Sequence, residues 1–346
     1  MVKRLLYKTL RVYLNVGLFF FFRKVMVSGI DNIPKSGPVI FVANHQNAIL
    51  DGVLVASATH RTCHFLTRAD IFVKPLYVKL LSLINSMPVY RFRDGFENLG
   101  QNARTFDRCY DVLMQNECIV IFPEGNHSFQ RRLRKLTKGF ARIVFGAMKK
   151  YSGLEINIVP VGINYTNHQQ FGSSVNILFG KPILASSFVD AHPASQLLKL
   201  TDELAAQMKK LITHVEDEEN YGRIILKLNK ANSNYLHPIG TNERIGRLTE
   251  IDEHPPVQSM DKGPDLFFFR YVAWLPNIFP FMAWRLFARK IKDPVFVGSA
   301  KFIFGIFVFP VILFLQSLLV GSLAGAIFGT LFFVLSIFSV KVLQKD

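Results

Sequence analysis

The sequence has few cysteines and few acidic residues. Its three cysteines, Cys63, Cys109 and Cys118, show neither a disulfide framework nor zinc-finger spacing, so we expect free thiols in a reducing compartment. Only 25 of the 346 residues are acidic, whereas 41 are Lys or Arg, and the net charge is +16. This excess favours an anionic partner, either an anionic membrane lipid or an acidic substrate. Nucleic acid is not expected as a partner, because the basic residues are scattered among apolar ones.

Common catalytic motifs are missing as well. The sequence contains no G-x-S-x-G, no P-loop, no G-x-G-x-x-G and no H-E-x-x-H. The usual signals of a serine hydrolase, a nucleotide-binding enzyme or a zinc protease are therefore absent. Half of the residues are hydrophobic and 33 are phenylalanine, a composition that argues against a disordered chain. The length suits one large domain or two.

Short apolar runs in the first half of the chain predict strands that are buried on both faces. These runs are Val39–Ala43, Cys118–Phe122, Ile158–Ile163 and Val175–Gly180. Segments with helical periodicity alternate with them, for example residues 99–116. We therefore expect an α/β fold over residues 24–190, in which a central mixed sheet is flanked by helices. Pro160 inside one of these runs suggests an edge strand, a bulge or a site of ligand approach.

The remaining regions differ in composition. Residues 1–23 place basic side chains on one helical face and apolar side chains on another, which predicts an amphipathic helix at a membrane surface. An ordinary core-packing helix is the alternative, whereas a signal peptide is not expected because no small-residue cleavage site follows. Residues 191–264 predict a helical extension followed by a linker rich in proline, glycine and charge.

Residues 265–346 predict a C-terminal membrane region. No charged residue occurs from Phe302 to Val340, a length that suits a transmembrane helical hairpin with its turn at or near Gly321. Lysines flank this run, so we expect both ends, and with them the catalytic domain, on the cytoplasmic side of the inner (plasma) membrane. The apolar stretch 266–284 contains Arg270 and two prolines, and we expect it to be interfacial or re-entrant rather than spanning.

Four motifs occur in a fixed order along the predicted α/β domain. His45 and Asp51 lie in "NHQNAILD", directly after a predicted strand, and "PVYR" follows at 88–91, "FPEG" at 122–125 and "VPV" at 159–161. This order resembles the glycerolipid acyltransferases of the bacterial type, which include lysophosphatidic acid and glycerol-3-phosphate acyltransferases. The resemblance implies a layered acyltransferase domain, covering about half of the chain.

The resemblance also implies roles for individual residues. His45 matches the catalytic histidine and Asp51 the aspartate that orients it. Arg91 matches an arginine that binds the phosphate of the acceptor, and Glu124 with Gly125 match the acceptor-binding turn. Pro160 matches a proline tied to donor binding or folding. The basic run ending at Lys138 would bind the phosphates of coenzyme A or an acidic carrier protein, or else form a solvated or lipid-facing surface.

Two departures from the family pattern stand out. Five residues separate His45 from Asp51 where four are usual, so the extra residue must be absorbed in a turn before the helix. The usual E-G-T-R-S becomes E-G-N-H-S at 124–128, which removes an arginine from the acceptor-binding turn.

These observations predict a membrane-bound O-acyltransferase that needs no cofactor or metal. An imidazole titrates near pH ~6.5 and can take the proton of an attacking hydroxyl group while a carboxylate fixes its tautomer. The expected partners are acyl-CoA or acyl-carrier protein as donor and a glycerophosphate or lysophospholipid as acceptor, with an amino-acid-linked lipid as another possible acceptor. The alternatives are a lipid phosphate hydrolase with a metal held by His45, Asp51, Glu124 and His127, and a non-catalytic lipid-binding protein.

Overall fold

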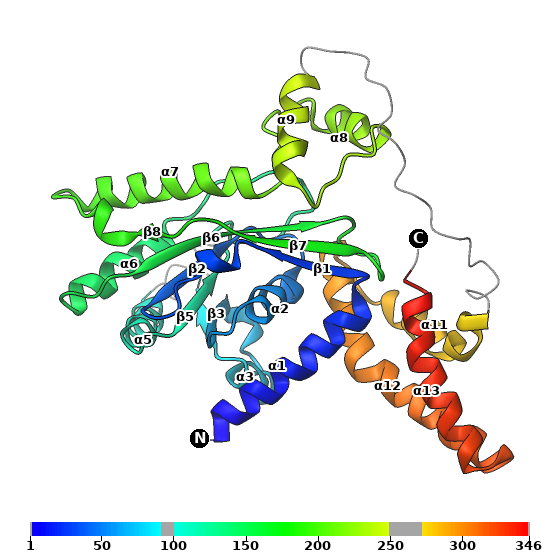
Figure 1. The fold of residues 1–346 in the computed structure, drawn as a ribbon. Coiled ribbons are helices and arrows are strands. Elements are labelled where there is room, and N and C mark those ends of the chain that lie inside the picture. Colours follow the sequence, from blue (N-terminus) through cyan, green and yellow to red (C-terminus); the bar gives the residue numbers. More distant parts are fainter. Residues whose placement is uncertain (1, 91–99, 249–271, 345–346) are drawn as a thin grey trace.

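A mixed sheet forms the centre of the molecule (Figure 1). The computed structural model describes residues 2–90, 100–248 and 272–344. The strand order is β1-β7-β6-β2-β5-β3-β4, and β8 pairs with β6 beside β7. β6 pairs antiparallel with β7 and β8, whereas the other neighbouring pairs are parallel. The predicted α/β fold, with a central mixed sheet flanked by helices, is confirmed.

The observed strands agree closely with the predicted ones. β2 has the predicted bounds, and the ends of the other three predicted strands shift by one or two residues. The strands are β1 Lys24–Ser28, β2 Val39–Ala43, β3 Cys63–Arg68, β4 Ser86–Val89, β5 Cys118–Ile121, β6 Asn157–Tyr165, β7 Ser174–Phe179 and β8 Ile183–Leu184. The main helices are α1 Val2–Phe21, α2 Ala48–Ala58, α3 Pro75–Leu83, α5 Asn102–Met114, α6 Gly139–Lys150, α7 Pro193–Leu211, α8 Tyr221–Lys230, α9 Pro238–Leu248, α11 Ile278–Ala288, α12 Val297–Ala324 and α13 Ala326–Val342.

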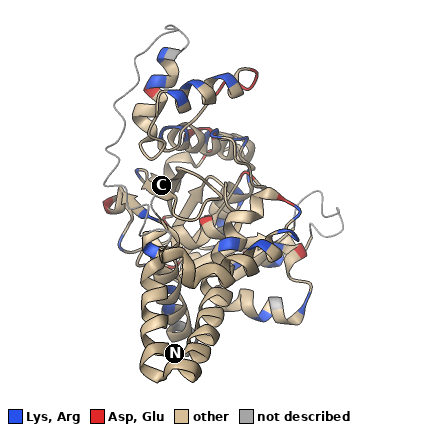
Figure 2. Cartoon of the chain, turned by 90° about the vertical axis from the view of Figure 1, so that its right-hand side faces the viewer, with Lys and Arg blue, Asp and Glu red and all other residues tan. Residues whose placement is uncertain are grey.

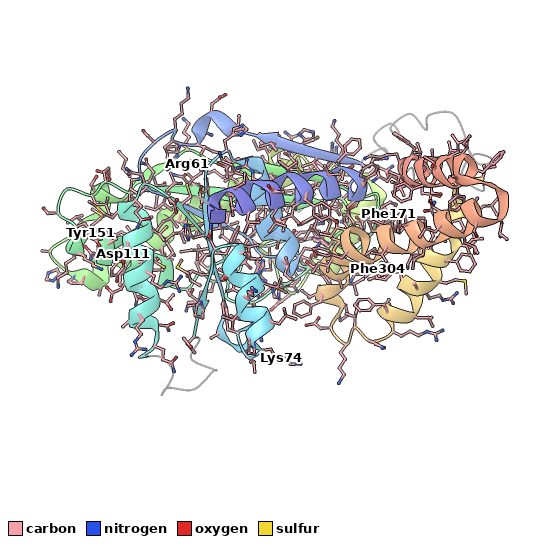
Figure 3. All side chains as sticks on the ribbon, turned by 90° about the horizontal axis from the view of Figure 1, so that it is seen from below. Arg61, Lys74, Asp111, Tyr151, Phe171 and Phe304 are labelled. Carbon is pink, nitrogen blue, oxygen red and sulfur yellow. The ribbon has the colours of Figure 1, made fainter. Side chains whose placement is uncertain are left out.

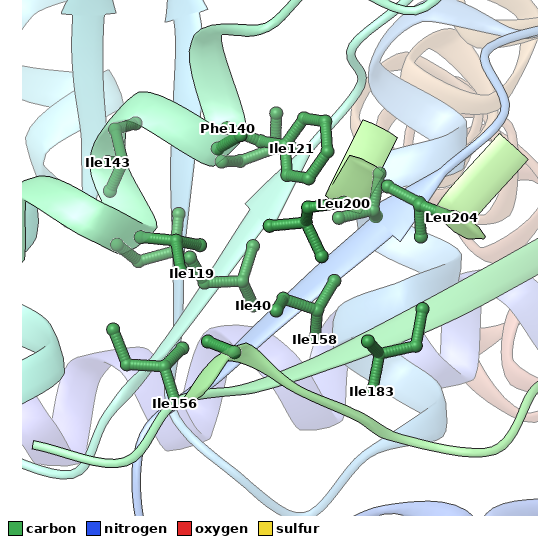
Figure 4. Packing of buried hydrophobic residues seen from close by; sticks show 14 of the residues in the cluster. Ile40, Ile119, Ile121, Phe140, Ile143, Ile156, Ile158, Ile183, Leu200 and Leu204 are labelled. Atoms are coloured by element: carbon green, nitrogen blue, oxygen red, sulfur yellow. The ribbon is translucent and has the colours of Figure 1, made fainter. Parts of the chain in front are cut away.

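Each face of the sheet has its own hydrophobic core. Side chains alternate along β2, so Ile40 and Val42 join the core beneath α5, α6 and α7, while Phe41 joins the core beneath α1 and α2. Figure 4 shows the first of these cores, in which Leu200 and Leu204 of α7 pack against isoleucines of the sheet. The predicted boundary at residue 190 thus falls between the last strand and a helix that completes this core.

Pro160 lies in the interior of the sheet. It is buried in β6, which has β2 on one side and β7 and β8 on the other, so the edge-strand interpretation is wrong. The carbonyl oxygen of Pro160 accepts a hydrogen bond from the Gly180 N–H at 2.8 Å. The nitrogen and oxygen of one strand residue point to the same side, so the missing N–H faces the gap between the end of β7 and the start of β8. The sheet therefore accommodates this proline without losing a ladder hydrogen bond.

The C-terminal region contains a helical hairpin (Figure 1). α12 starts at Val297, before the predicted Phe302, and the chain reverses at Gly325, four residues after Gly321. By length and composition, the helical segment Pro294–Ala324 can cross a membrane, whereas α13 is a shorter apolar helix of 17 residues. Within the stretch 266–284, residues 266–271, including Arg270, lie outside the described residues.

α1 packs against this hairpin. The hydroxyl group of Tyr13 donates to the carbonyl oxygen of Ile306, and the Gly17 backbone lies close against Phe302 and Ile306 of α12. α1 also leaves several apolar side chains exposed, among them Leu5, Leu6, Val12, Val16 and Phe19. The N-terminal helix is therefore present, and it shares one side of the molecule with α12.

Candidate active site

Three loops meet at one edge of the sheet. β2 lies between β5 and β6, and both pairings are parallel, so the carboxyl ends of these strands lie side by side. In α/β sheets, ligands bind at such carboxyl ends. The segments that follow the three strands are residues 44–47, 122–128 and 166–168. The Asn44 side chain joins two of the strand ends, because it donates to the Ile163 carbonyl and accepts from the Ile163 N–H.

A histidine and a buried carboxylate form the centre of this edge. His45 Nδ1 lies 2.8 Å from Asp51 Oδ2, and the Asp51 side chain is completely buried. The same oxygen accepts from the backbone N–H groups of Gln46 at 2.8 Å and Asn47 at 2.7 Å. The other oxygen accepts from the Tyr165 hydroxyl at 2.6 Å. Because a carboxylate accepts at Nδ1, that nitrogen carries the proton and Nε2 presents its lone pair.

The turn before α2 absorbs the extra residue between His45 and Asp51, as the sequence required. α2 begins at Ala48, and Ala48 has a φ of 35°, in the left-handed region that non-glycine residues rarely adopt. Asp51 thereby falls in the first helical turn and points back to the residues that precede the helix. The wide spacing in the sequence is therefore compatible with direct contact between the two side chains.

Aromatic rings surround the His45 imidazole and leave one nitrogen available. The ring stacks on Phe122, with centroids 4.1 Å apart, and contacts the His127 ring at 4.1 Å. Burial lowers the pKa of His127 to about 4, and the neighbouring His45 adds to the effect, so His127 is neutral near pH 7. The His45 side chain is 13% exposed, and Nε2 has no hydrogen-bond partner among the described residues.

Glu124 and Gly125 form a turn that is bonded to the histidine loop. Glu124 Oε1 accepts from the His45 N–H at 3.1 Å, and the His45 carbonyl accepts from the Ser128 N–H. Gly125 has a φ of 74°, which favours glycine, and open space lies beside its Cα. Burial raises the pKa of Glu124, although its ion pair with Arg134 acts in the opposite direction.

Arg134 occupies the turn from which the family's arginine is missing. Its Nε lies 2.6 Å from Glu124 Oε2, and its two terminal nitrogens donate to the side chain and the carbonyl group of Asn126. A planar guanidinium suits such a fork of acceptors. Arg134 belongs to the basic run seen in the sequence, but its distance from the turn along the chain concealed this contact.

The basic run is largely used inside the protein. Arg131 is buried and donates to the carbonyl groups of Tyr165 and Thr166, and Arg132 pairs with Glu218. Only Lys135 and Lys138 of the run are exposed, and Lys138 immediately precedes α6. The solvated or lipid-facing surface expected for this run therefore does not include Arg131, and Arg132 and Arg134 pair with Glu218 and Glu124 within the fold.

The remaining residues predicted for the site, Arg91 and Pro160, do not belong to its described surface. Arg91 lies outside the described residues, and Pro160 is buried within β6. Tyr165 was not identified from the sequence, although it ends the "VPVGINY" strand, four residues beyond Val161, which pairs with the last residue of β2. A cavity of about 460 Å³ adjoins the site through His168, whose Nε2 lies 3.0 Å from Gln46 Oε1.

Comparison with known proteins places this domain in a family. Residues 24–164 match the family model described as Acyltransferase. The chain is 37% identical over 78 residues to glycerol-3-phosphate O-acyltransferase 1 of Saccharomyces cerevisiae, which covers 22% of this chain and 10% of that protein. It is 26% identical over 160 residues to the probable 1-acyl-sn-glycerol-3-phosphate acyltransferase of Mycoplasma pneumoniae, which covers 44% of this chain and 54% of that protein. The chain thus spans between a tenth and about half of these two relatives.

A solved structure was also found. The 1-acyl-sn-glycerophosphate acyltransferase PlsC of Thermotoga maritima aligns with a TM-score of 0.45 and 19% identity, over 60% of this chain and 80% of that chain. The family match covers all four motifs that suggested the resemblance, from His45 to the V-P-V segment. Residues 24–164 of this protein are therefore an acyltransferase domain, as the order of those motifs predicted.

Proposed function

We propose that this protein is a membrane-bound glycerolipid O-acyltransferase of phospholipid synthesis. It transfers a fatty acyl group from acyl-CoA or acyl-carrier protein to a hydroxyl group of glycerol-3-phosphate or 1-acylglycerol-3-phosphate. The observation that carries this proposal is the 2.8 Å contact between His45 Nδ1 and the buried Asp51, which leaves Nε2 as an available base. The names of the matched relatives support the substrate class.

The proposed reaction is a direct transfer. The acceptor hydroxyl group gives its proton to His45 Nε2 as its oxygen attacks the thioester carbonyl carbon. The new C–O bond forms, the C–S bond breaks, and the proton passes from His45 to the departing thiolate. Asp51 holds the Nδ1–H tautomer and stabilises the imidazolium between these steps. The Phe122 ring against the imidazole excludes water from one face.

Cationic and backbone groups would bind the phosphate of the acceptor. We assign this task to Arg91, which follows the P-V-Y segment, and to the open side of the turn at Gly125. Glu124 has both oxygens engaged by His45 and Arg134, so we assign it to shaping this turn rather than to free contact with the acceptor. Lys138 is exposed and available to the phosphates of the donor. Pro160, which is buried, acts in folding.

The C-terminal hairpin and α1 would hold the domain on the membrane. No residue from 302 to 340 is charged, so the hairpin is almost entirely tan in Figure 2. Figure 3 shows Asp111 and Tyr151 at the end of the molecule remote from Phe304 of α12. Lys301 donates to the Gln169 carbonyl. Lys341 donates to the carbonyl groups of Phe19 in α1 and of Phe22 just after it. Both ends of the hairpin would therefore lie on the side of the active site, which we propose is the cytoplasmic side.

The length of α11 favours the proposal that the stretch before the hairpin does not cross the membrane. It has 11 residues, a length of about 16 Å, whereas a bilayer core is about 30 Å thick. Several of its apolar side chains, including Phe279, Met282 and Leu286, are exposed. A helix of this kind suits the membrane interface.

The alternative function, a metal-dependent hydrolase, is disfavoured because the carboxylate oxygens that would bind the metal already take part in hydrogen bonds. Both oxygens of Asp51 accept hydrogen bonds, and both oxygens of Glu124 are engaged by His45 and Arg134. In the described parts of the chain, no group of three or more His, Cys, Asp or Glu side chains is arranged to hold a metal. An amino-acid-linked lipid stays open as an acceptor, since it also presents a hydroxyl group.

The test is a transfer assay with purified protein in lipid vesicles. Labelled acyl-CoA and acyl-carrier protein are each offered with glycerol-3-phosphate, 1-acylglycerol-3-phosphate and a hydroxylated aminoacyl lipid. We expect transfer in the presence of EDTA, and a loss of about 10² to 10⁴-fold in His45→Ala. The exposed His60→Ala serves as the matched control. Transfer by His45→Ala within about threefold of the wild-type rate would contradict the assignment, and Arg91→Ala should raise the KM of the acceptor more than that of the donor.

A further inference from the structure

A serine from the C-terminal hairpin is bonded into the turn that carries the active-site residues. Ser299, in the first turn of α12, is 3% exposed. Its hydroxyl group donates to the Asn47 carbonyl at 2.8 Å and accepts from the Leu50 N–H at 3.1 Å. Asn47 is the N-cap residue of α2, yet its own side chain makes no capping hydrogen bond. Ser299 therefore supplies the cap that the N-terminus of α2 lacks locally.

The two hydrogen bonds of Ser299 enclose a strained residue. Ala48, with its φ of 35°, lies between Asn47 and Leu50. A non-glycine residue keeps such a conformation only when the surrounding structure enforces it. The conformation of Ala48 brings Asp51 back to His45, because it absorbs the extra residue between them. Releasing the cap would let this turn relax and move Asp51 away from the imidazole.

Neighbouring contacts fix the start of α12 against the same turn. A Cβ atom added at Gly298 would lie 2.4 Å from the His168 carbonyl oxygen and 2.7 Å from the Asn47 side chain, so only glycine allows this close approach. The Gln169 side chain donates to the Pro294 carbonyl, and the Phe296 ring lies 5.4 Å from the His127 ring. α12 and α2 lie side by side (Figure 1).

We propose that Ser299 is a positioning residue for the His45–Asp51 pair. The C-terminal region, which lies outside the family match at residues 24–164, would thus complete the active site of the domain. Ser299 does not touch the reacting atoms in this scheme. It acts by holding the strained Ala48 turn, so that Asp51 accepts from His45 Nδ1 and Nε2 stays free for the substrate. The kinetic part of this inference rests on the proposed function.

The first test is spectroscopic and needs no activity. The chain has nine histidines, so selective ¹⁵N-histidine labelling gives a small set of signals, and the spectrum of His45→Ala assigns those of His45. In the wild type we expect the Nδ1–H tautomer of His45. In Ser299→Ala we expect a mixture with the Nε2–H tautomer. The control is Ser336→Ala, because Ser336 is also buried in the hairpin but its hydroxyl group donates to the Phe332 carbonyl of its own helix. Unchanged His45 signals in Ser299→Ala would overturn the proposal.

The second test is kinetic and separates positioning from general stability. Loss of a capping serine typically weakens a helix start by an amount equivalent to about a fivefold change in rate, so we expect kcat of Ser299→Ala to fall about fivefold. The KM values for donor and acceptor should change less than about twofold, and Ser336→Ala should keep the wild-type kcat. A Ser299→Ala enzyme with wild-type kcat, or with a change confined to KM, would contradict the inference.

A double variant tests whether Ala48 carries the effect. Glycine adopts positive φ without steric cost, so in an Ala48→Gly background the turn depends less on the Ser299 cap. We expect Ser299→Ala to lower kcat less in that background than in the wild type. An equal loss in both backgrounds would show that Ser299 acts by another route. If the wild type transfers no acyl group to any acceptor, the proposed function fails, whereas the tautomer of His45 in Ser299→Ala still decides the role of Ser299.

Discussion

Replacing Asp51 with asparagine isolates the charge of the carboxylate. Asp51→Ala is a poor test, because it leaves the buried N–H groups of Gln46 and Asn47 and the Tyr165 hydroxyl without a partner. Each unsatisfied group costs about 1–3 kcal/mol, so the sum approaches the total stability of a domain. In Asp51→Asn, the amide oxygen can take the place of Oδ2, and the amide nitrogen can donate to the Tyr165 oxygen. The contacts to the two backbone N–H groups then survive without the charge, whereas the Tyr165 hydroxyl accepts instead of donating.

The expected loss follows from this geometry. Two fixed backbone N–H groups point at the Oδ2 position, so they select the amide orientation that keeps the Nδ1–H tautomer of His45. What is lost is the attraction between carboxylate and imidazolium, about 4 kcal/mol for full charges at ~4 Å and an effective dielectric constant of about 20. With the proton about half transferred in the transition state, the loss is about 2 kcal/mol, or about 30-fold in kcat. An amide in the opposite orientation would impose the wrong tautomer and cost about 10⁴-fold.

The assay is the vesicle transfer reaction at saturating donor and acceptor. The exposed Asp202→Asn on α7 serves as the control for an equal change of charge. The melting temperature of Asp51→Asn should be lowered less than that of Asp51→Ala, because only the Tyr165 O–H loses its acceptor. A kcat within about threefold of the wild type would refute the role of the charge. A loss near 10⁴-fold would refute the argument that the two backbone N–H groups fix the amide.

Three further predictions concern the turn, the buried histidines and the membrane orientation. Arg134→Lys keeps the positive charge but removes the planar guanidinium that donates to both Glu124 and Asn126. The value of kcat/KM for the acceptor should therefore fall about tenfold. An unchanged value would show that the turn does not need the guanidinium group. Burial lowers the pKa of His168 to about 3, whereas the pKa in the unfolded chain is ~6.5. Between these two values the unfolded state binds more protons than the folded state. The melting temperature should therefore drop as pH falls from ~6.5 towards 4. His168→Gln should flatten that drop, and an equally steep drop would remove His168 as its cause. In intact cells, a cysteine replacing the exposed Leu323 at the hairpin tip should react with an impermeant thiol reagent from outside, whereas one at position 343 should not, and labelling at 343 would contradict the topology.

The strands and the motif order were predictable because they depend on local patterns. A strand buried on both faces is a short apolar run, and β2 was predicted with its observed bounds for that reason. The His45–Asp51 contact was predictable since both residues lie within one loop and the first turn of one helix. The uncharged run that forms most of the hairpin was also predictable from the sequence. The position at which the chain reverses, Gly325, depends on how α12 and α13 pack.

Contacts between distant segments were decided only by the tertiary structure. The Tyr165 hydroxyl meets Asp51 across 114 residues, because β6 pairs in parallel with β2 and extends four residues beyond Val161, the partner of the last β2 residue. Ser299 meets Asn47 across 252 residues, because the start of α12 packs against α2. Sequence patterns report the periodicity of one element, whereas these hydrogen bonds depend on the register and packing of several. The sequence alone therefore predicted four of the eight described strands, the motif order and the pairing of His45 with Asp51. The packed structure determined the remaining strands and the residues that hold that pair in place.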